Sequence, residues 1–306
     1  TSAVMLAILS TILLYFKAEL QSISKALTRR DITSVLQFCV LSLVVLPILP
    51  NRNFGPYDTL NPYQVWWMVV LISGVSLAGY AALRIVGQRH GALLLGILGG
   101  LASSTATTLV YSRHASESEK LQPLSLVVIL TANLVVLFRL AIVTAILQPA
   151  ILQHLLPVLG SGALAGLVFV AFAWQRMSDG RELPQLELRN PTELATALTF
   201  GAVYAGVLLL SAALSDKAGS LGLYAVALVS GLTDVDAITL SSLRLFGQEK
   251  LAATAATTAI LLAVLANLSF KFGIVVSVAG RALAMRVLGG FTAFAAGCIG
   301  GWLMAA

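Results

Sequence analysis

Asp234 and Asp236 stand two residues apart inside an apolar region, in the segment SGLTDVDAITLSS (residues 230–242). Carboxylate oxygens, together with nearby hydroxyl and carbonyl oxygens, are the ligands that a hard divalent cation prefers. On an intact helix, residues two apart point about 200° away from each other, so both could face one ion only if the helix is interrupted there. The pair therefore predicts a cation site on a broken helix.

A second segment offers hydroxyl groups at matching positions. GALLLGILGGLASSTATTL (residues 91–109) aligns without a gap with GLYAVALVSGLTDVDAITL (residues 222–240), and Ser103 takes the place of Asp234. If the two segments face each other, one supplies hydroxyl groups and the other carboxylates. The residues predicted to bind the ion are Asp234, Asp236, Ser103, Ser104, Thr105 and Thr233.

Glycines precede both polar segments and favour an interruption of each helix. Gly99 and Gly100 precede the first polar segment, and Gly231 precedes the second. A glycine inside a helix is less favourable than alanine by about 1 kcal/mol, and the polar residues that follow have the capping pattern of a helix N-terminus. We therefore expect an unwound turn within residues 99–105 and 230–236, where freed carbonyl groups could become ligands.

Four further residues could support the site. Asn133 and Asn267 lie in two ANL tripeptides, each in the middle of an apolar stretch. Lys271 follows Asn267 by four residues, on the same helix face, and could either pair with an aspartate or extend to the membrane surface. Arg139 has the same two alternatives. If both basic side chains reach the surface, the two carboxylates are left without enough buried cations to neutralise them.

The composition is that of a membrane protein. The chain has 306 residues, of which 58% are hydrophobic and only 10% charged, with a mean hydropathy of +0.92. A soluble domain carries about 25% charged residues, and apolar runs of about 20 residues, long enough to cross a bilayer, recur along the chain. Because the backbone must satisfy its own hydrogen bonds in hydrocarbon, we expect an all-α polytopic protein in the lipid bilayer.

The pattern of apolar runs predicts about ten transmembrane helices. Charged and proline-rich stretches mark several of the breaks between them, and the longest polar stretch, at 175–191, is the best candidate for a boundary between halves. The predicted spans are 2–16, 31–50, 63–86, 91–112, 121–147, 155–174, 191–214, 220–243, 251–279 and 286–305.

A collinear series of matches indicates an internal duplication. Asn61-Pro62 returns as Asn190-Pro191, and the two aligned segments and the two ANL tripeptides follow in the same order. The matches divide the chain into two leading helices at 1–50 and two four-helix repeats at 61–175 and 190–305. Because four is even, both repeats enter the membrane from the same side, which predicts a pseudo-twofold axis along the membrane normal with a site at the repeat interface.

The quoted motifs also carry a resemblance. The segment LTRRDITSVLQFCVLSLVVLPILPNRNFGPYDTLNPYQVWWMVVLISGVSLAGY, together with GGLASSTATT and SGLTDVDAIT, resembles bacterial membrane proteins that join an MgtC/SapB-type N-terminal region to a DUF4010 domain. Residues 61–305 would be the DUF4010 part, and residues 1–50 the end of the MgtC-like part. MgtC-like proteins are associated with magnesium homeostasis, so the resemblance implies a multi-pass protein of the bacterial inner membrane with a link to magnesium. It implies no site.

The expected function is transport of a cation, with Mg²⁺ or another divalent ion as the bound species and no other cofactor. A proton or a monovalent ion becomes the alternative if Lys271 pairs with an aspartate. Two other classes stay open: a regulatory or scaffolding membrane protein in ion homeostasis, and an organic-solute carrier.

Structural explanations compete with each of these functions. The aspartates could mark a solvated helix start, and the glycines could serve close helix packing alone.

Other classes are not supported by the motifs. No Walker A, G-x-S-x-G or H-E-x-x-H sequence is present, so we do not expect an enzyme. The formal net charge is +6, but the basic residues are scattered through short loops without an aromatic platform, so we expect no nucleic-acid partner. The sequence is compatible with a homo-oligomer.

Overall fold

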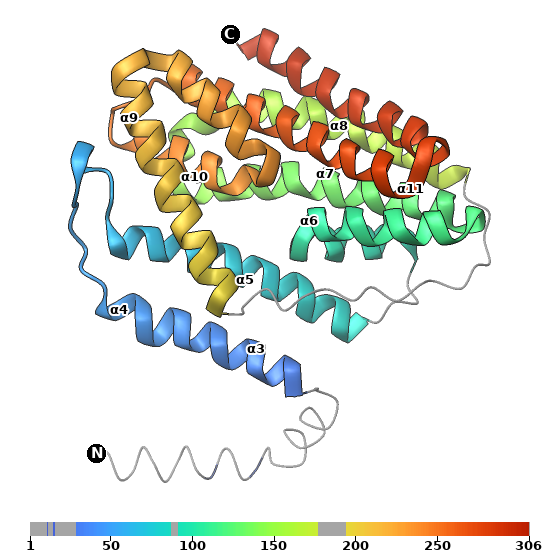
Figure 1. Cartoon of the computed structure of the whole chain (residues 1–306), viewed down its shortest axis with the longest axis horizontal. Coiled ribbons are helices and arrows are strands. Elements are labelled where there is room, and N and C mark those ends of the chain that lie inside the picture. Colours follow the sequence, from blue (N-terminus) through green and yellow to red (C-terminus); the bar gives the residue numbers. More distant parts are fainter. Residues whose placement is uncertain (1–10, 12–14, 16–28, 87–90, 177–193, 306) are drawn as a thin grey trace.

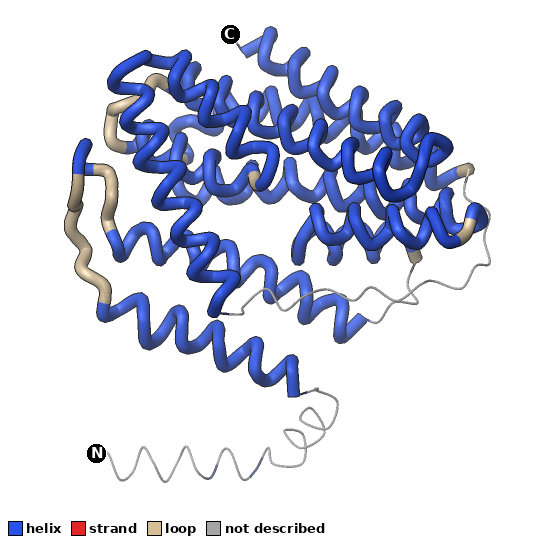
Figure 2. The backbone as a smooth tube through the Cα atoms, in the orientation of Figure 1, coloured by secondary structure: helices blue, strands red, loops and turns tan. Residues whose placement is uncertain are grey.

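The computed structural model describes residues 29–86, 91–176 and 194–305, together with Thr11 and Tyr15. Within these ranges the chain is helical and has no strand, apart from a lone bridge between Phe54 and Leu60 (Figure 2). The all-helical class is therefore confirmed for the described part of the chain. Nearly all of the predicted span 2–16 and of the polar stretch 175–191 lies outside the described residues.

The helices vary in length from single turns to the 53 residues of α11, which consists of two segments joined at Gly280 (Figure 1). They are α3 (Arg29–Cys39), the π-helix Val40–Val45, α4 (Leu46–Ile48), α5 (Pro62–Val86), α6 (Ala92–Glu117), α7 (Gln122–Leu147), α8 (Leu152–Gln175), α9 (Leu194–Thr233), α10 (Val235–Gly247) and α11 (Ala253–Ala305). Four helical stretches are long and apolar enough to cross a membrane, judged by length and composition over the described residues: Ala92–Glu117, Glu119–Leu147, Pro149–Gln175 and Ala253–Ala305.

Helix α7 forms the centre of the bundle. It packs against α6 on one side and α8 on the other, and it also contacts α10 and α11. Most of its residues are buried, because neighbours surround it on nearly every side. Pro123 suits the first turn of α7, where the missing N–H has no partner to lose. A polar side chain on α7 must therefore find its partners inside the protein.

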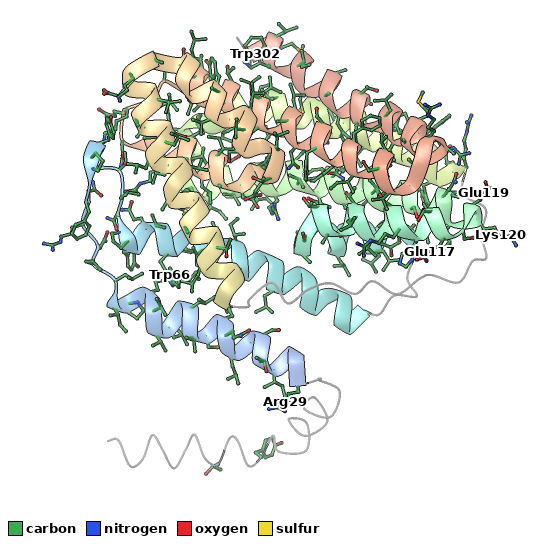
Figure 3. All side chains as sticks on the ribbon, in the orientation of Figure 1. Arg29, Trp66, Glu117, Glu119, Lys120 and Trp302 are labelled. Atoms are coloured by element: carbon green, nitrogen blue, oxygen red, sulfur yellow. The ribbon has the colours of Figure 1, made fainter. Side chains whose placement is uncertain are left out.

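Two glycines allow α9 and α11 to turn. Gly219 and Gly280 have φ angles of 58° and 77°, in the left-handed region that glycine adopts without steric cost. In α11 the chain folds back on itself, since the indole nitrogen of Trp302 donates to the hydroxyl of Thr258 at 3.0 Å (the tryptophan is labelled in Figure 3). The two turns fall between residue ranges that the sequence predicts to be separate helices.

The N-terminal helices form a small unit of their own. Leu41 is fully buried and packs with Val69 and Val70 of α5, in a cluster separate from the main core. The indole nitrogen of Trp66 donates to the carbonyl of Leu41 at 2.9 Å. The carbonyl of Leu41 also accepts the backbone N–H of Leu46 within the π-helix, so the indole hydrogen bond ties this turn to α5.

Candidate functional site

Helical geometry is interrupted at Ser103 in α6 and at Asp234 between α9 and α10. Ser103 has φ −168° and ψ 105°, and Asp234 has φ −155° and ψ 135°, so both are extended residues between helical segments. These are the positions that the gap-free alignment pairs. The interruptions lie within the stretches 99–105 and 230–236, where the sequence predicted them.

Both interrupting side chains act as helix caps. The carboxylate of Asp234 accepts hydrogen bonds from the backbone N–H groups of Asp236 and Ala237, at 3.1 and 3.3 Å. The hydroxyl of Ser103 accepts from the N–H of Ala106 at 3.3 Å. Such a side chain satisfies backbone donors that a helix start leaves unpaired. The interruption is thus caused by the polar side chain at the break.

The glycines serve helix packing and are not themselves the points of interruption. Gly99, Gly100 and Gly231 are helical. A Cβ atom on Gly100 would lie 2.6 Å from the carbonyl oxygen of Ala132, and one on Gly231 would lie 2.5 Å from that of Ala263. The expectation that these glycines break the helices is therefore wrong in detail, because their missing side chains instead allow α7 and α11 to approach closely.

Arg139 of α7 forms a buried ion pair with Asp236. Its Nη2 atom lies 2.6 Å from Oδ2 of the carboxylate, and the exposed fractions of the two residues are 9% and 5%. Desolvating two charges is costly, and a close pairing offsets much of that cost. The alternative in which Arg139 extends to the membrane surface is wrong for this structure.

Lys271 of α11 is buried as well, with an exposed fraction of 1%. Its ammonium group donates to the hydroxyl of Ser104 and to the amide oxygen of Asn133, both at 2.8 Å. It also interacts electrostatically with both aspartates, although no ion pair with either is among the contacts of the described residues. Lys271 therefore neither extends to the surface nor forms the direct salt bridge that the sequence offered as the alternative.

Together these residues form a charge cluster at membrane depth. Asn133 lies near the midpoint of α7, and its amide nitrogen donates to Thr108 at 3.3 Å and to the carbonyl of Ile129 at 2.8 Å. We define the charge cluster as Asp234, Asp236, Arg139 and Lys271, with Ser104 and Asn133 as its neutral partners. The cluster contains two carboxylates and two basic groups, so its formal charges cancel. The idea that the carboxylates lack buried cations is wrong.

Three predicted site residues lie beside the cluster without bonding to its charged groups. Asn267 donates to the carbonyl of Gly231 at 2.9 Å and so ties α11 to the end of α9. The hydroxyl of Thr233 donates to the carbonyl of Ser230 at 3.0 Å. Within the described part of the chain, Thr105 makes no hydrogen bond through its side chain to the cluster. Among the predicted hydroxyl residues, Ser104 is the one that contacts a charged group, the ammonium of Lys271.

Space inside the cluster is small. Asn133, Asn267 and Lys271 line a cavity of about 10 Å³ together with apolar side chains such as Val264 and Phe294. A volume of roughly 10 to 15 Å³ holds a single water molecule. Among the described residues there is also no group of three or more His, Cys, Asp or Glu side chains that could hold a metal ion. With its two carboxylates already balanced by Arg139 and Lys271, the cluster is a poor fit to a divalent cation.

Comparison with known protein families gives a match. The profile of the family described as a domain of unknown function (DUF4010) matches residues 70–279. The chain belongs to the DUF4010 family. The matched region contains both helix interruptions and the whole charge cluster. It does not include residues 1–50, so the expected resemblance of that part to MgtC/SapB proteins stays a prediction.

One relative extends the comparison. An uncharacterized protein of Aquifex aeolicus (strain VF5) is 31% identical to this DUF4010 protein over 182 residues, which cover 59% of this chain and 79% of the relative. No solved structure matches the chain significantly. The function of this DUF4010 protein must therefore be argued from its own geometry.

The structure adds hydroxyl groups that were not among the predicted site residues. Thr239 and Ser242 of α10 follow Asp236 at intervals of three, so the three residues are neighbours along the helix. Their buried hydroxyl oxygens have no hydrogen-bond partner among the described residues of this DUF4010 protein. Thr108 contacts Asn133 and aligns with Thr239, a match that was visible in the sequence. Buried hydroxyls of this kind are commonly satisfied by ordered water.

Proposed function

We propose that this DUF4010 protein is a secondary transporter that exchanges a monovalent cation for a proton at the charge cluster, of which Asp236, Arg139 and Lys271 are buried and Asp234 is half-buried. The observation that carries the proposal is the convergence of four ionisable side chains at membrane depth, beside two helix interruptions. Ionisable groups in this setting are costly and mark ion or proton pathways. Interrupted helices beside such groups are a common construction in transporter sites.

Lys271 supplies the chemistry of exchange. Its ammonium group occupies a place surrounded by oxygens, from Ser104 and Asn133, with the aspartate charges nearby. When the ammonium loses its proton to water, the cluster is left with one unbalanced negative charge. A monovalent cation can then take the position of the ammonium group, with the same oxygens as ligands. Arg139 keeps its charge throughout and holds Asp236 in place.

A hollow beside the second half of α10 supports access to the cluster from one end of the bundle. Its volume is about 400 Å³, and Leu240, Leu243 and Arg244 line it from the face of α10 on which Asp236 also lies. Leu240, one helical turn from Asp236, and Gln64 of α5 are among the residues that line this hollow. The hollow supports an access path from that end, while the small cavity at the cluster corresponds to an occluded state.

The finer architecture belongs to the same proposal. We infer ten spans and two parallel four-helix repeats, at 61–175 and 190–305, in the bacterial inner membrane. The paired positions of Ser103 and Asp234 and the turns at Gly219 and Gly280 support this arrangement. The balanced charges of the cluster favour a monovalent ion over Mg²⁺ as the transported species. If residues 1–50 are related to MgtC-like proteins, the link of this protein to magnesium homeostasis would therefore be indirect.

The proposal is tested by proton movement in liposomes. Purified protein is reconstituted with a pH-sensitive dye inside, and an outward or inward gradient of Na⁺ or K⁺ is imposed. We expect the gradient of the transported ion to drive protons in the opposite direction. Lys271→Gln should abolish this coupled movement, because the amide cannot release a proton. Lys217→Gln, at an exposed position of α9, is the matched control and should leave the movement unchanged.

The aspartates provide a second arm of the same experiment. Asp234→Asn and Asp236→Asn should each abolish coupled proton movement, whereas Asp216→Asn, at an exposed position, should not. A gradient of Mg²⁺ is tested in parallel. Proton movement driven by Mg²⁺ alone, or movement that persists in Lys271→Gln, would contradict a monovalent exchange at Lys271.

A scaffold without transport is the second candidate, and one observation favours it. The cavity at the cluster is about 10 Å³, so the seam between α7, α10 and α11 is nearly closed in this structure. In that case the charged groups would only hold helices together. No ion movement under any gradient, in protein that is folded and inserted, would favour the scaffold over the transporter.

A further inference from the structure

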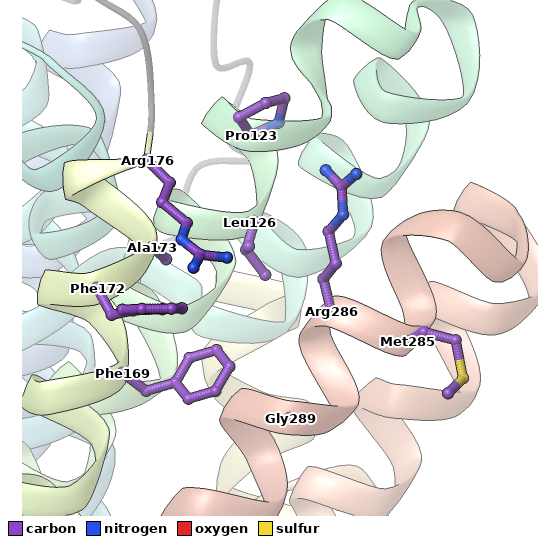
Figure 4. Close-up of a pocket in the computed structure, with 9 residues that line it drawn as sticks. All are labelled: Pro123, Leu126, Phe169, Phe172, Ala173, Arg176, Met285, Arg286 and Gly289. Atoms are coloured by element: carbon purple, nitrogen blue, oxygen red, sulfur yellow. The ribbon is translucent and has the colours of Figure 1, made fainter.

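A groove at the start of α7 lies apart from the charge cluster. Its volume is about 400 Å³, and it is bounded by the beginning of α7, the end of α8 and the second segment of α11 (Figure 4). Leu126, which lines the groove, is about two helical turns along α7 from Asn133. The groove is therefore separate from the proposed exchange site.

The groove has apolar walls and two basic groups at its rim. Leu126, Phe169, Phe172 and Gly289 contribute to its apolar lining. The guanidinium group of Arg176 lies 4.0 Å from the centre of the Phe172 ring, a stacked position that holds it over the groove.

Arg286 rises from α11 on the opposite side of the groove (Figure 4). No acidic residue is among the described residues that line the groove. Within the described part of the chain, both guanidinium groups therefore line the groove without a carboxylate beside them there.

The level of the groove in the bundle matches the membrane surface. Helix α7 begins at Gln122, helix α8 ends at Gln175, and the second segment of α11 begins just after Gly280. The ends of spanning helices lie where hydrocarbon gives way to lipid headgroups. Arg176 directly follows the end of α8, and Arg286 lies less than two turns after Gly280, so we expect both guanidinium groups to reach the headgroup level.

We propose that this groove binds an anionic phospholipid, with its phosphate between Arg176 and Arg286 and an acyl chain against the apolar lining. Basic pockets between membrane helices are suited to anionic headgroups, and a guanidinium group can donate two parallel hydrogen bonds to a phosphate. A soluble anion would leave the apolar lining unused, and a neutral lipid would leave the two positive charges unpaired. An anionic phospholipid satisfies both parts of the groove.

The test measures lipid retention by native mass spectrometry of the detergent-purified full chain. Dioleoyl phosphatidylglycerol and dioleoyl phosphatidylcholine are compared, because they share acyl chains and differ in headgroup charge. Because two arginines attract the anionic headgroup, we expect the anionic lipid to be retained at least about tenfold better. The double variant Arg176→Gln/Arg286→Gln should lose most of this preference while still folding, since both side chains are exposed.

The control removes two arginines from outside the groove. In Arg52→Gln/Arg113→Gln one of the lost guanidinium groups also lies over an aromatic ring, that of Phe54, at 4.7 Å, and the loss of charge is equal. This variant should keep the preference for phosphatidylglycerol. Equal preference in the two double variants would overturn the lipid site. Inorganic phosphate is added as a competitor, and its binding without any preference for the anionic lipid would overturn the lipid assignment in favour of a free anion.

Discussion

At the scale of single residues, the charge cluster combines one tight pair with one looser group. Asp236 is held by Arg139 at 2.6 Å, whereas Lys271 is held by two neutral oxygens. A cation bound by neutral acceptors can be exchanged for another cation more readily than one locked to a carboxylate. The pair and the lysine should therefore respond differently to substitution.

The pair is tested by comparing a single with a double substitution. Arg139→Gln leaves the buried Asp236 carboxylate unpaired and should lower the free energy of unfolding by about 3 to 5 kcal/mol. Arg139→Gln/Asp236→Asn removes both charges and should be less destabilised than Arg139→Gln alone. Unfolding by a denaturing detergent in mixed micelles measures both. Equal losses in the single and double variants would contradict a stabilising pair at this position.

At the scale of elements, the start of α10 shows why a helix can begin in the middle of an apolar region. The Asp234 carboxylate caps two N–H groups, and the same residue brings charge to the cluster. The cap and the charge are separate contributions, because asparagine and serine can cap a helix without a charge.

Substitutions at Asp234 separate the two contributions. Asp234→Ala removes the cap and should lower the free energy of unfolding by about 1 kcal/mol. Asp234→Ser keeps a capping oxygen and should lose clearly less. Both variants remove the charge, so both should lose coupled proton movement. Thermal unfolding followed by circular dichroism gives the stability, and identical unfolding of the two variants would argue against the cap.

The helix interruptions could be predicted from the sequence because capping is local. Ser103 and Asp234 act on backbone groups two or three residues away, and the alignment of the two segments marks both. The partners of Lys271 could not be predicted in the same way. They lie on α6 and α7, at Ser104 and Asn133, and only the packing of three helices determines which oxygens reach the ammonium group.

The role of the glycines also depends on tertiary contacts that the sequence could not predict. Gly100 and Gly231 could be recognised as unusual in a helix, and both helix breaking and close packing fitted that pattern. The contact that decides between them, with the backbone of Ala132 or Ala263, is a tertiary one. The low helix propensity of glycine therefore marked these positions, but it could not show whether they break a helix or allow close helix packing.

At the scale of the whole molecule, the two hollows of about 400 Å³ lie at different parts of the bundle and have different linings. One is bounded by arginines and apolar side chains at the start of α7. The other is reached from the end of α7 and contains Gln64, Gln148 and Arg244. The charge cluster lies between these levels along α7. Among the described residues, the hollow beside α10 is therefore the one that we propose as the approach to the exchange site.

Cysteine accessibility tests that approach. In a chain whose own Cys39 and Cys298 are replaced by alanine, Leu243→Cys should react with a positively charged, water-soluble methanethiosulfonate reagent. Leu243 lines the hollow but is buried in this structure, so its reaction requires water to enter from the hollow. Leu130→Cys, in the apolar core of α7, is the control and should react severalfold more slowly. Leu240→Cys, which also lines the hollow and lies one turn nearer to Asp236, should react at an intermediate rate, because the reagent must pass Leu243 to reach it. If Leu243→Cys reacted no faster than Leu130→Cys, this face of α10 would be a sealed contact between helices, and the exchange site would need another route to water.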